Sequence, residues 1–352
     1  MRIGILGAGG IANTMAGTLD MMIDRARGSM ADDSAAGAAG SDGTPPEACD
    51  IVCEAIAARD LSRAEAFARE YGFNKAYGSY DELLSDPDVD LVYIALPHSH
   101  HYEWTIKALN SGKHVLCEKA FAVNEKQARE MIELAEHKGL LLTEAIWTRY
   151  TPSRKIIHDL VMSGEIGKIW TISANLGYKI DMNERLVKPE LAGGALLDLT
   201  IYPLNFTSML LGDDIGQLAC SCSMTETGVD GQDSVTLTYK DGEVAHLFTT
   251  IYTLTDRRGM IYGDDGFIEV DNINNPLSVR VYSNDRHPGP KLLKEIKMPE
   301  QLTGYEYEVE ACARAIKEGM TECPEMPHSE TLVMMRLMDS IRGKFGIKYP
   351  CE

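Results

Sequence analysis

The sequence predicts a two-domain α/β protein, in which a doubly wound parallel sheet is followed by an α+β domain with a large, open, mostly antiparallel sheet. The chain has 352 residues, which is long for a single hydrophobic core. Up to about Ile146, apolar strands alternate with amphipathic helices, a pattern typical of parallel sheets. Beyond that point, several strand-like runs follow one another directly. We therefore expect one domain over residues 1–145 and another over residues 146–352.

The first domain should consist of short apolar strands joined by helices. We expect its strands at residues 2–9, 53–58, 90–96, 114–119 and 140–147. We expect its helices at about residues 11–23, 62–72, 102–112 and 125–139. Residues 26–50 are rich in Ala, Gly, Ser and Asp and have few large apolar side chains, so they can bury little. We predict that this segment is a flexible surface insertion.

The second domain should be built mainly from consecutive strands with turn residues between them. We expect its strands at residues 168–178, 216–224, 234–240, 243–252, 258–263, 266–271 and 278–283. "DG" pairs within "KDGE" and "GDDG" are hairpin signals between some of these strands. We expect helices at about residues 153–163, 198–211, 305–319 and 329–345. This pattern predicts an antiparallel sheet with helices on one face.

Charge and cysteine content exclude several classes of function. The formal net charge is −19, which disfavours binding to nucleic acid or to anionic membranes. We find no apolar run of about 18 residues that could span a membrane. The chain has eight cysteines, and none forms a C-x-x-C pair of the kind found in structural zinc sites. We therefore expect a cytoplasmic protein with free thiols and a small-molecule partner.

The stretch "GAGGIA" predicts a dinucleotide site near the N-terminus. It fits G-x-G-x-x-G/A, and it follows an apolar strand and opens a helix, as this Rossmann motif requires. Gly7 would allow the tight turn, Gly9 would let the backbone approach a diphosphate, and Ala12 would keep helix and strand close. The diphosphate would lie at the helix N-terminus beside Gly10 and Ile11.

The end of the second strand bears on the choice between NADP and NAD. An acidic side chain at this point binds the ribose hydroxyls of NAD, whereas arginine accommodates the 2′-phosphate of NADP. Arg59 comes first after the strand, Asp60 follows one position later, and Arg63 comes one helical turn further on. This order favours NADP, with NAD as the alternative.

Lys119, Asp198 and Tyr202 are the candidate catalytic residues. Lys119 ends the strand at 114–119, at the sheet edge where ligands bind in this fold. Asp198 and Tyr202 stand at i and i+4, on one face of a predicted helix. A lysine near a tyrosine should lower the pKa of the phenol, which would suit it to acid–base chemistry. Outside this context, Asp198 would be read as a helix cap and Tyr202 as a core residue.

The stretch "LPHSHHY" places His98, His100 and His101 within four positions. One interpretation is a metal site of a hydrolase, which would also need a carboxylate or a further histidine around the metal. The other is a strand-to-helix loop beside the cofactor, because the stretch follows the strand at 90–96 and precedes the helix at 102–112.

Several longer blocks carry a family resemblance. They are "AARDLSRAEAFA" at 57–68, "KAYGSYDELL" at 75–84, "VLCEKA" at 115–120, "EAIWTRY" at 144–150 and "GGALLDLTIY" at 193–202. The sequence resembles the glucose–fructose oxidoreductase/inositol dehydrogenase (Gfo/Idh/MocA) family of NAD(P)-dependent enzymes over nearly the whole chain apart from residues 26–50. Within that family it is most similar to the dimeric dihydrodiol dehydrogenases and the NADP-dependent D-xylose dehydrogenases.

The resemblance implies roles for individual residues. Lys119 matches the lysine of the family's E-K-P motif, which contacts the substrate hydroxyl. Tyr202 matches the general acid/base, and Asp198 matches the acidic residue that positions substrate one turn earlier. Pro97 would fix the loop turn and His98 would face the nicotinamide side, with His100 exposed to solvent. The residues implied to contact the cofactor are Leu96, Pro97, His98, His101, Glu118, Lys119, Trp147 and Arg149.

Ala120 stands where the family motif has proline. A cis bond before a residue other than proline costs about 3–4 kcal/mol, so we expect a trans bond here and a slightly different aim of Lys119. The resemblance also implies a homodimer or homotetramer formed through the C-terminal sheet.

These observations predict an NADP-dependent oxidoreductase that acts on a CH–OH group of an aldose such as xylose or glucose, or of a cyclic diol. The alternatives are an NAD-dependent inositol or keto-sugar dehydrogenase and a non-catalytic dinucleotide-binding sensor. Retention of Lys119, Asp198 and Tyr202 together argues against the sensor. No resident metal is expected.

Overall fold

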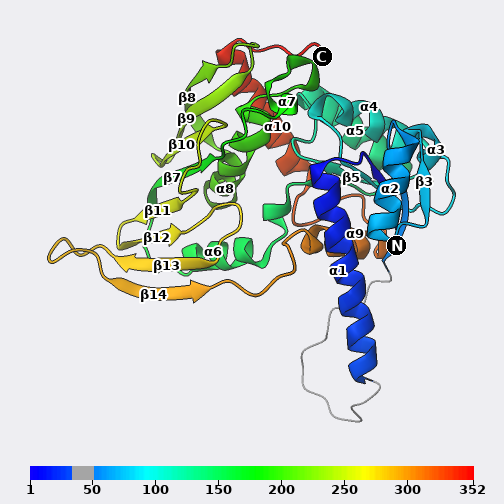
Figure 1. Ribbon diagram of the computed structural model, residues 1–352. Coiled ribbons are helices and arrows are strands. Elements are labelled where there is room, and N and C mark those ends of the chain that lie inside the picture. Colours follow the sequence, from blue (N-terminus) through cyan, green and yellow to red (C-terminus); the bar gives the residue numbers. More distant parts are fainter. Residues whose placement is uncertain (34–50) are drawn as a thin grey trace.

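The computed structural model describes residues 1–33 and 51–352, and two sheets form its framework (Figure 1). The N-terminal sheet has the strand order β3-β2-β1-β4-β5-β6, and all its neighbouring strands pair in parallel. Its strands are β1 (Arg2–Leu6), β2 (Val52–Ala57), β3 (Lys75–Tyr77), β4 (Leu91–Ile94), β5 (His114–Glu118) and β6 (Leu142–Ala145). The prediction of a doubly wound parallel sheet is confirmed.

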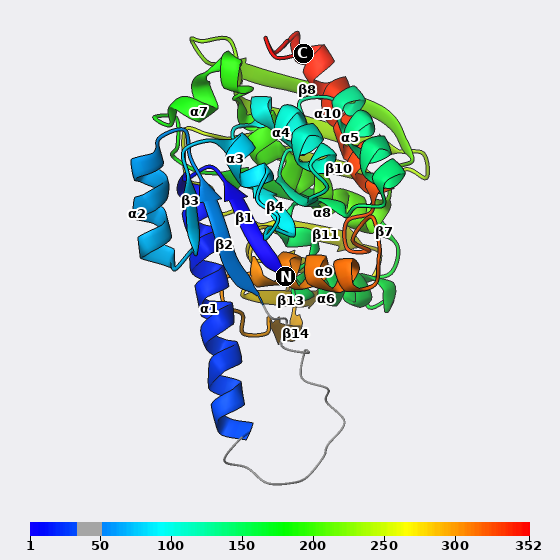
Figure 2. The same cartoon turned by 90° about the vertical axis from the view of Figure 1, so that its right-hand side faces the viewer.

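Each helix of this domain follows a strand and therefore begins at the carboxyl edge of the sheet. They are α1 (Gly10–Asp33), α2 (Leu61–Tyr71), α3 (Tyr80–Leu84), α4 (His98–Asn110) and α5 (Glu125–Lys138). The strand order reverses between β1 and β4, which lie side by side in Figure 2. Ligands of such sheets bind at this reversal, outside the carboxyl ends of the strands. The turns after β1 and β4 therefore face the expected cofactor site.

The C-terminal sheet has the order β14-β13-β12-β11-β7-β10-β9-β8. Its strands are β7 (Ile169–Gly177), β8 (Ile215–Met224), β9 (Asp230–Tyr239), β10 (Val244–Thr250), β11 (Gly259–Gly263), β12 (Gly266–Val270), β13 (Ser278–Ser283) and β14 (Leu292–Lys297). Neighbouring strands are antiparallel except for β7 and β10, which pair in parallel. The predicted large, mostly antiparallel sheet is confirmed.

Within residues 1–33 and 51–352, helices cover one face of this second sheet and leave the other face open. The helical elements of the C-terminal part are the single turn Trp147–Arg149, α6 (Pro152–Met162), α7 (Glu184–Val187), the turn Pro189–Leu191, the π-helical turn Leu196–Thr200, α8 (Ile201–Leu211), α9 (Glu306–Lys317) and α10 (His328–Phe345). α8 packs against β7 and β10, and α10 packs against β8. Along β10, buried Ala245 and Leu247 alternate with exposed His246 and Phe248.

The last two helices return to the first domain. α9 packs against α1, and α10 packs against α5. Two hydrogen bonds join α10 to the first domain. His328 Nε2 lies 2.8 Å from the Leu142 carbonyl oxygen, and the Glu125 amide donates to Asp339 at 2.8 Å. Both domains thus form one connected body around the site, and the boundary at residues 145/146 stays a prediction.

Several predicted boundaries were wrong. α1 runs to Asp33 instead of ending near Ile23, and Arg25 on this extension forms an ion pair with Glu310 of α9. The rest of the predicted insertion, residues 34–50, lies outside the described residues. α4 begins at His98, so the histidine cluster lies in the first helical turn and not in a loop.

The short elements β3, α3 and α7 and the edge strand β14 were not predicted. In the described parts of the chain, no helix is long and apolar enough to cross a membrane. The cysteines of the described segments, which include all but Cys49, are free thiols.

Candidate active site

The glycine turn after β1 has the geometry that a diphosphate requires. Gly7 has a φ of +101°, and a Cβ added there would lie 2.6 Å from the Ala95 carbonyl oxygen, so no larger residue fits. A Cβ at Gly9 or Gly10 would meet nothing within 4 Å, so the backbone is open to a ligand here. Ala12 is fully buried at the contact of α1 with the sheet. These residues fit an NAD(P) diphosphate at the start of α1.

Asp60 and the two arginines behind β2 have different environments. The Asp60 side chain is the N-cap of α2, because its Oδ1 accepts hydrogen bonds from the Ser62 amide at 2.9 Å and the Ser62 hydroxyl at 2.8 Å. Arg63 reaches back to the glycine turn and donates from Nη2 to the Ala8 carbonyl oxygen at 2.9 Å. Arg59 is exposed at the strand tip. The Asp60 carboxylate at this tip therefore already has a structural partner.

Lys119, Asp198 and Arg185 form the charged centre of the second cluster. Lys119 Nζ lies 2.8 Å from the Asp198 carbonyl oxygen and 3.1 Å from Asp198 Oδ1. Arg185 Nη2 donates to the same Oδ1 at 2.9 Å. The structure thus joins Lys119 at the end of β5 to the π-helical turn, as the sequence predicts, and adds Arg185 from α7, which sequence reasoning missed.

Asp198 remains an anion in this arrangement. Its burial opposes ionisation, but the charges of Lys119 and Arg185 outweigh that effect and hold the pKa of the carboxyl below its usual range. Asp198 can therefore accept hydrogen bonds but cannot act as a proton donor near neutral pH. Two cations against one carboxylate leave this cluster with a positive charge, which suits an oxygen that gains negative charge during a reaction.

Tyr202 packs directly beneath Lys119. The Lys119 ammonium lies 5.0 Å from the centroid of the Tyr202 ring. The expected lowering of the phenol pKa was wrong: burial, together with the charges of Glu118 and Asp198, raises the pKa of Tyr202 well above its ordinary value. Burial is the largest of these causes, and it outweighs the effect of the nearby lysine. Tyr202 is therefore protonated at rest.

The turn that carries Lys119 differs from the expectation. The peptide bond between Lys119 and Ala120 is cis, so the prediction of a trans bond was wrong. Contacts from outside the turn hold it, since His101 Nδ1 lies 2.8 Å from the Ala120 carbonyl oxygen and the Phe121 amide donates to Glu144 Oε1 at 3.1 Å. These contacts come from residues distant in the sequence, so the local sequence around residue 120 does not reveal them.

The three histidines at the start of α4 have different environments. His98 is buried, and its Nδ1 lies 2.9 Å from the carbonyl oxygen of Ala192, so Nδ1 carries the proton and Nε2 is an acceptor. Burial, with the charge of Arg185, lowers the pKa of His98 to about 3. His101 is fully buried and links Ala120 to Leu96, whereas His100 is half-buried. Among the described residues, no group of three or more His, Cys, Asp or Glu side chains could hold a metal ion.

Glu118 and Trp147 lie close to this cluster. The Glu118 carboxylate is buried and accepts hydrogen bonds from the Tyr93 hydroxyl and from the Lys119 amide, the latter at 3.1 Å. Trp147 stacks on Tyr305 with ring centroids 4.8 Å apart, so it closes the site from the side of α9.

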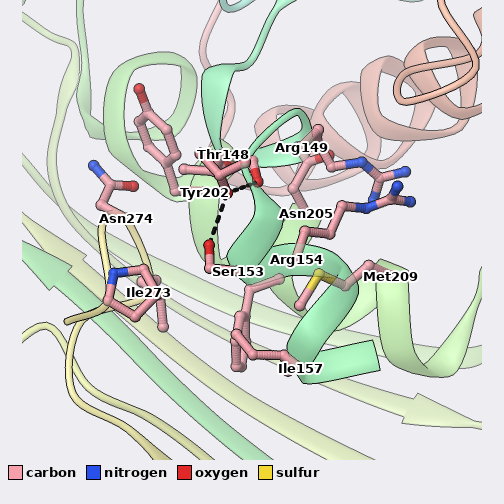
Figure 3. Close-up of a pocket in the computed structure, with 13 residues that line it drawn as sticks. Thr148, Arg149, Ser153, Arg154, Ile157, Tyr202, Asn205, Met209, Ile273 and Asn274 are labelled. Carbon is pink, nitrogen blue, oxygen red and sulfur yellow. Dashed lines mark hydrogen bonds between the residues drawn. The ribbon is translucent and has the colours of Figure 1, made fainter. Parts of the chain in front are cut away.

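Arg149 is placed away from the charged centre. It is buried against Glu330 at the start of α10. Figure 3 shows Arg149 and Arg154 extending side by side, while the Tyr202 hydroxyl points away from them. A small cavity of about 20 Å³ lies between these residues. The cofactor role predicted for Arg149 stays a prediction, and the structure gives its side chain a structural partner.

Comparison with known proteins agrees with this architecture. Residues 1–146 match the model of the oxidoreductase family with an NAD-binding Rossmann fold, and residues 155–269 match the GFO/IDH/MocA C-terminal domain. The chain belongs to the GFO/IDH/MocA family. The resemblance seen in the sequence is confirmed, and the protein is an NAD(P)-dependent oxidoreductase.

Two relatives within the family illustrate its similarity. Trans-1,2-dihydrobenzene-1,2-diol dehydrogenase of Xenopus tropicalis is 34% identical over 306 residues, which are 86% of this chain and 92% of that protein. D-xylose 1-dehydrogenase (NADP(+)) of Hypocrea jecorina is 33% identical over 338 residues, with 86% of each chain covered.

Solved structures of lower identity share the fold. The 3-ketoreductase KijD10 of Actinomadura kijaniata, in complex with NADP and TDP-benzene, superimposes with a TM-score of 0.82 at 24% identity and covers 97% of each chain. Levoglucosan dehydrogenase in complex with NADH gives a TM-score of 0.78 at 18% identity, with 98% of this chain and 97% of that chain covered. The fold therefore occurs with either dinucleotide.

Proposed function

We propose that this family member is an NADP-dependent dehydrogenase that transfers hydride between nicotinamide and the carbinol carbon of a sugar or a cyclic diol. The observation that carries the proposal is the contact of Lys119, Asp198 and Tyr202 at the carboxyl end of β5. The names of the relatives, a diol dehydrogenase and a D-xylose dehydrogenase, support this substrate class.

The chain's own residues would handle the substrate oxygen and its proton. When bound, the nicotinamide supplies or accepts the hydride. Lys119 Nζ would donate a hydrogen bond to the reacting oxygen, and ionised Asp198 would accept one from a neighbouring hydroxyl. Tyr202 is protonated at rest, so in the reducing direction it would donate its proton to the carbonyl oxygen. In the oxidising direction it would have to lose that proton before it could accept one from the substrate.

A substrate screen tests this proposal. We expect the wild-type protein to form NADPH from NADP⁺ with at least one compound from a panel of aldoses, inositols and cyclic diols. Failure across the whole panel, in both directions, would contradict the dehydrogenase assignment and favour a dinucleotide-binding sensor. Reduction of NAD⁺ alone would favour the NAD-dependent alternative.

The proposal of NADP rests on Arg59 and Arg63. Arg59 directly follows β2, and Arg63 lies in the first turn of α2, beside the region where the 2′-phosphate of NADP binds in this fold. Asp60 between them already caps the helix. Arg59→Ala should raise the Kd of NADPH by about tenfold or more, because a charged hydrogen bond is lost, and should change the Kd of NADH little. Arg69→Ala, in the last turn of α2, is the matched control. Equal effects on both dinucleotides would reject the 2′-phosphate role.

We further propose that the protein works in the cytoplasm and assembles as a homodimer or homotetramer through the open face of the C-terminal sheet. Unpaired thiols support a reducing compartment. Aromatic rings contact one another across neighbouring strands: Phe267 stacks on Tyr282 with centroids 4.8 Å apart and makes a tilted contact with Tyr262 at 5.8 Å. Phe248 on the same sheet is 46% exposed. Aromatic residues gathered on one face are typical of interfaces.

A further inference from the structure

Two buried carboxyl groups, Asp230 and Asp233, lie at the start of β9 and have no role in the chemistry described above. Asp230 is 0% exposed and Asp233 is 1% exposed. Burying two acidic groups side by side is unfavourable unless hydrogen bonds and a proton compensate them. The pair therefore calls for a physical explanation.

A β-bulge brings the two side chains to the same face of the sheet. Residues three apart on a regular strand point to opposite faces. Here Ser223 pairs with Gln232 while Met224 pairs with Asp230, so Gly231 is the extra residue of a bulge. The bulge turns Asp230 to the side of the sheet on which Asp233 is buried.

The two carboxyl groups hold opposite ends of the π-helical turn Leu196–Thr200. Asp230 Oδ2 accepts a hydrogen bond from the Leu196 amide at the start of this turn. Asp233 Oδ2 accepts a hydrogen bond from the Thr200 hydroxyl at its end, at 2.7 Å. Asp198 lies between these two anchors, and Tyr202 follows them on α8. π-Helical turns are frequent at functional sites.

The close fit around Asp230 shows that its position is specific. Gly194 precedes the turn with a φ of +117°, and a Cβ there would lie 2.2 Å from Asp230 Oδ1. A Cβ on Gly231 would lie 2.2 Å from the Tyr252 hydroxyl oxygen. A larger residue at Gly194 would displace the Asp230 carboxyl group, and one at Gly231 would displace the Tyr252 ring.

One proton shared by the two carboxyl groups would satisfy the two oxygens that have no other hydrogen-bond partner in the described part of the chain. Asp230 Oδ1 and Asp233 Oδ1 are both buried and have no donor among the described residues. Each carboxyl group thus keeps one buried oxygen without a protein donor in residues 1–33 and 51–352, and a proton held between the two groups would serve both oxygens. Burial raises the pKa of Asp230 to about 6, and burial together with the charge of Asp230 raises the pKa of Asp233 well above its usual value.

The other polar groups around the pair do not replace that proton. The Tyr349 hydroxyl after α10 is buried near both carboxyl groups, with the Arg342 guanidinium over its ring at 5.1 Å. The thiols of Cys220 and Cys222 on β8 approach Asp233, and burial raises the pKa of both thiols, so they stay neutral. Thr249 on β10 contacts Thr200 and completes the surroundings.

We propose that Asp230 and Asp233 share one proton and act as positioning residues that clamp the π-helical turn, so that Asp198 and Tyr202 meet Lys119. This inference rests on the proposed function, because it assigns the pair a role in the geometry of that site. Asp233 holds the proton and donates it to Asp230, and each carboxyl group keeps one oxygen for the turn.

Kinetics of two variants at Asp233 test the clamp. An amide can still donate to Asp230 and accept from Thr200, so Asp233→Asn should keep kcat near the wild-type value. Asp233→Ala removes one anchor and should lower kcat by about tenfold to a hundredfold, with the Kd of NADPH unchanged. Asp271→Asn, in a turn outside the site where Asp271 accepts the Leu277 and Ser278 amides, is the matched control. Wild-type kcat in Asp233→Ala, or an equal loss in both variants, would overturn the proposal.

Thermal unfolding as a function of pH tests the shared proton without any activity assay. The folded pair holds a proton that the unfolded chain releases above its ordinary carboxyl pKa, so stability from the pair is present at acid pH and is lost as pH rises. The Tm of the wild type should therefore fall relative to that of Asp233→Asn between about pH 5 and pH 8. Parallel Tm curves would overturn the proposal. If no sugar or diol is turned over, the proposed function fails, while this comparison still decides whether the pair shares a proton.

Discussion

At the scale of single residues, Asp198 sets the charge of the candidate active site. Its Oδ1 receives both Lys119 and Arg185, so the carboxylate stays ionised and the lysine is oriented before substrate arrives. A group fixed in this way can respond to a developing negative charge without reorganising. Tyr202 keeps its proton because burial, together with the charges of Glu118 and Asp198, raises the pKa of its phenol.

Arg185 should therefore matter for catalysis although it does not follow from any motif. Arg185→Met removes one of the two cations at Asp198 and should lower kcat/KM on the order of tenfold, because a charged hydrogen bond at the site is lost. Arg185→Lys should recover part of this loss. Lys188→Met, which removes an exposed cation paired with Glu184 near the same helix, serves as the control. The role of Arg185 is excluded if both methionine variants match the wild type in steady-state kinetics.

The sequence predicts some of these residues and not others for a clear reason. Asp198 and Tyr202 are one helical turn apart, and Lys119 ends a strand, so local patterns place them. Arg185 lies on a four-residue helix, and no local pattern connects it to Asp198. The pKa of Tyr202 was predicted wrongly because it depends on burial and on Glu118, which only the tertiary structure shows.

At the scale of elements, the start of α2 decides how the cofactor site is interpreted. Asp60 could bind the ribose of NAD or cap the helix, and the structure shows the cap. An N-cap satisfies backbone amides that have no partner within the helix. The start of α4 was also predicted wrongly. Pro97 stands at its N-cap, so the helix already begins at His98.

Substitution of Asp60 separates the two interpretations. Asp60→Ala should lower Tm by a few degrees through loss of the cap, and Asp60→Asn should keep most of the stability. Neither change should weaken NADH binding if the carboxylate only caps α2. Calorimetry combined with titration of NADH and NADPH measures both effects. Selective loss of NADH affinity in Asp60→Ala would show that the carboxylate binds ribose.

At the scale of the whole molecule, one face of the C-terminal sheet has no covering layer among the described residues (Figure 1). Helices α8 and α10 cover the other face, and the order of strands along the sheet depends on pairings between distant segments such as β7 and β10. The sequence predicts the two sheets from their different patterns. It does not predict the parallel pair within the second sheet or the return of α9 and α10 to the first domain, because these are long-range contacts without a local signal.

The open face should be the surface that joins copies of the chain. Phe248→Glu places a charge in its centre and should dissociate the assembly, because burying an unpaired charge at an interface is unfavourable. Leu277→Glu, at a residue that is 76% exposed in the turn between β12 and β13, should leave the assembly intact. Sedimentation velocity of both variants measures the outcome. A wild-type protein that is monomeric at all concentrations would contradict this assignment.

In the proposed reaction, Tyr202 exchanges the proton of the reacting oxygen while Lys119 holds that oxygen. The most direct test is the single-turnover rate of Tyr202→Phe with a substrate found in the screen, together with its Kd for NADPH. The phenyl ring keeps the packing beneath Lys119 and removes only the hydroxyl group. We predict that the rate falls by about a hundredfold or more, as for loss of a general acid, while the Kd for NADPH stays near that of the wild type. A wild-type rate in Tyr202→Phe would contradict the account.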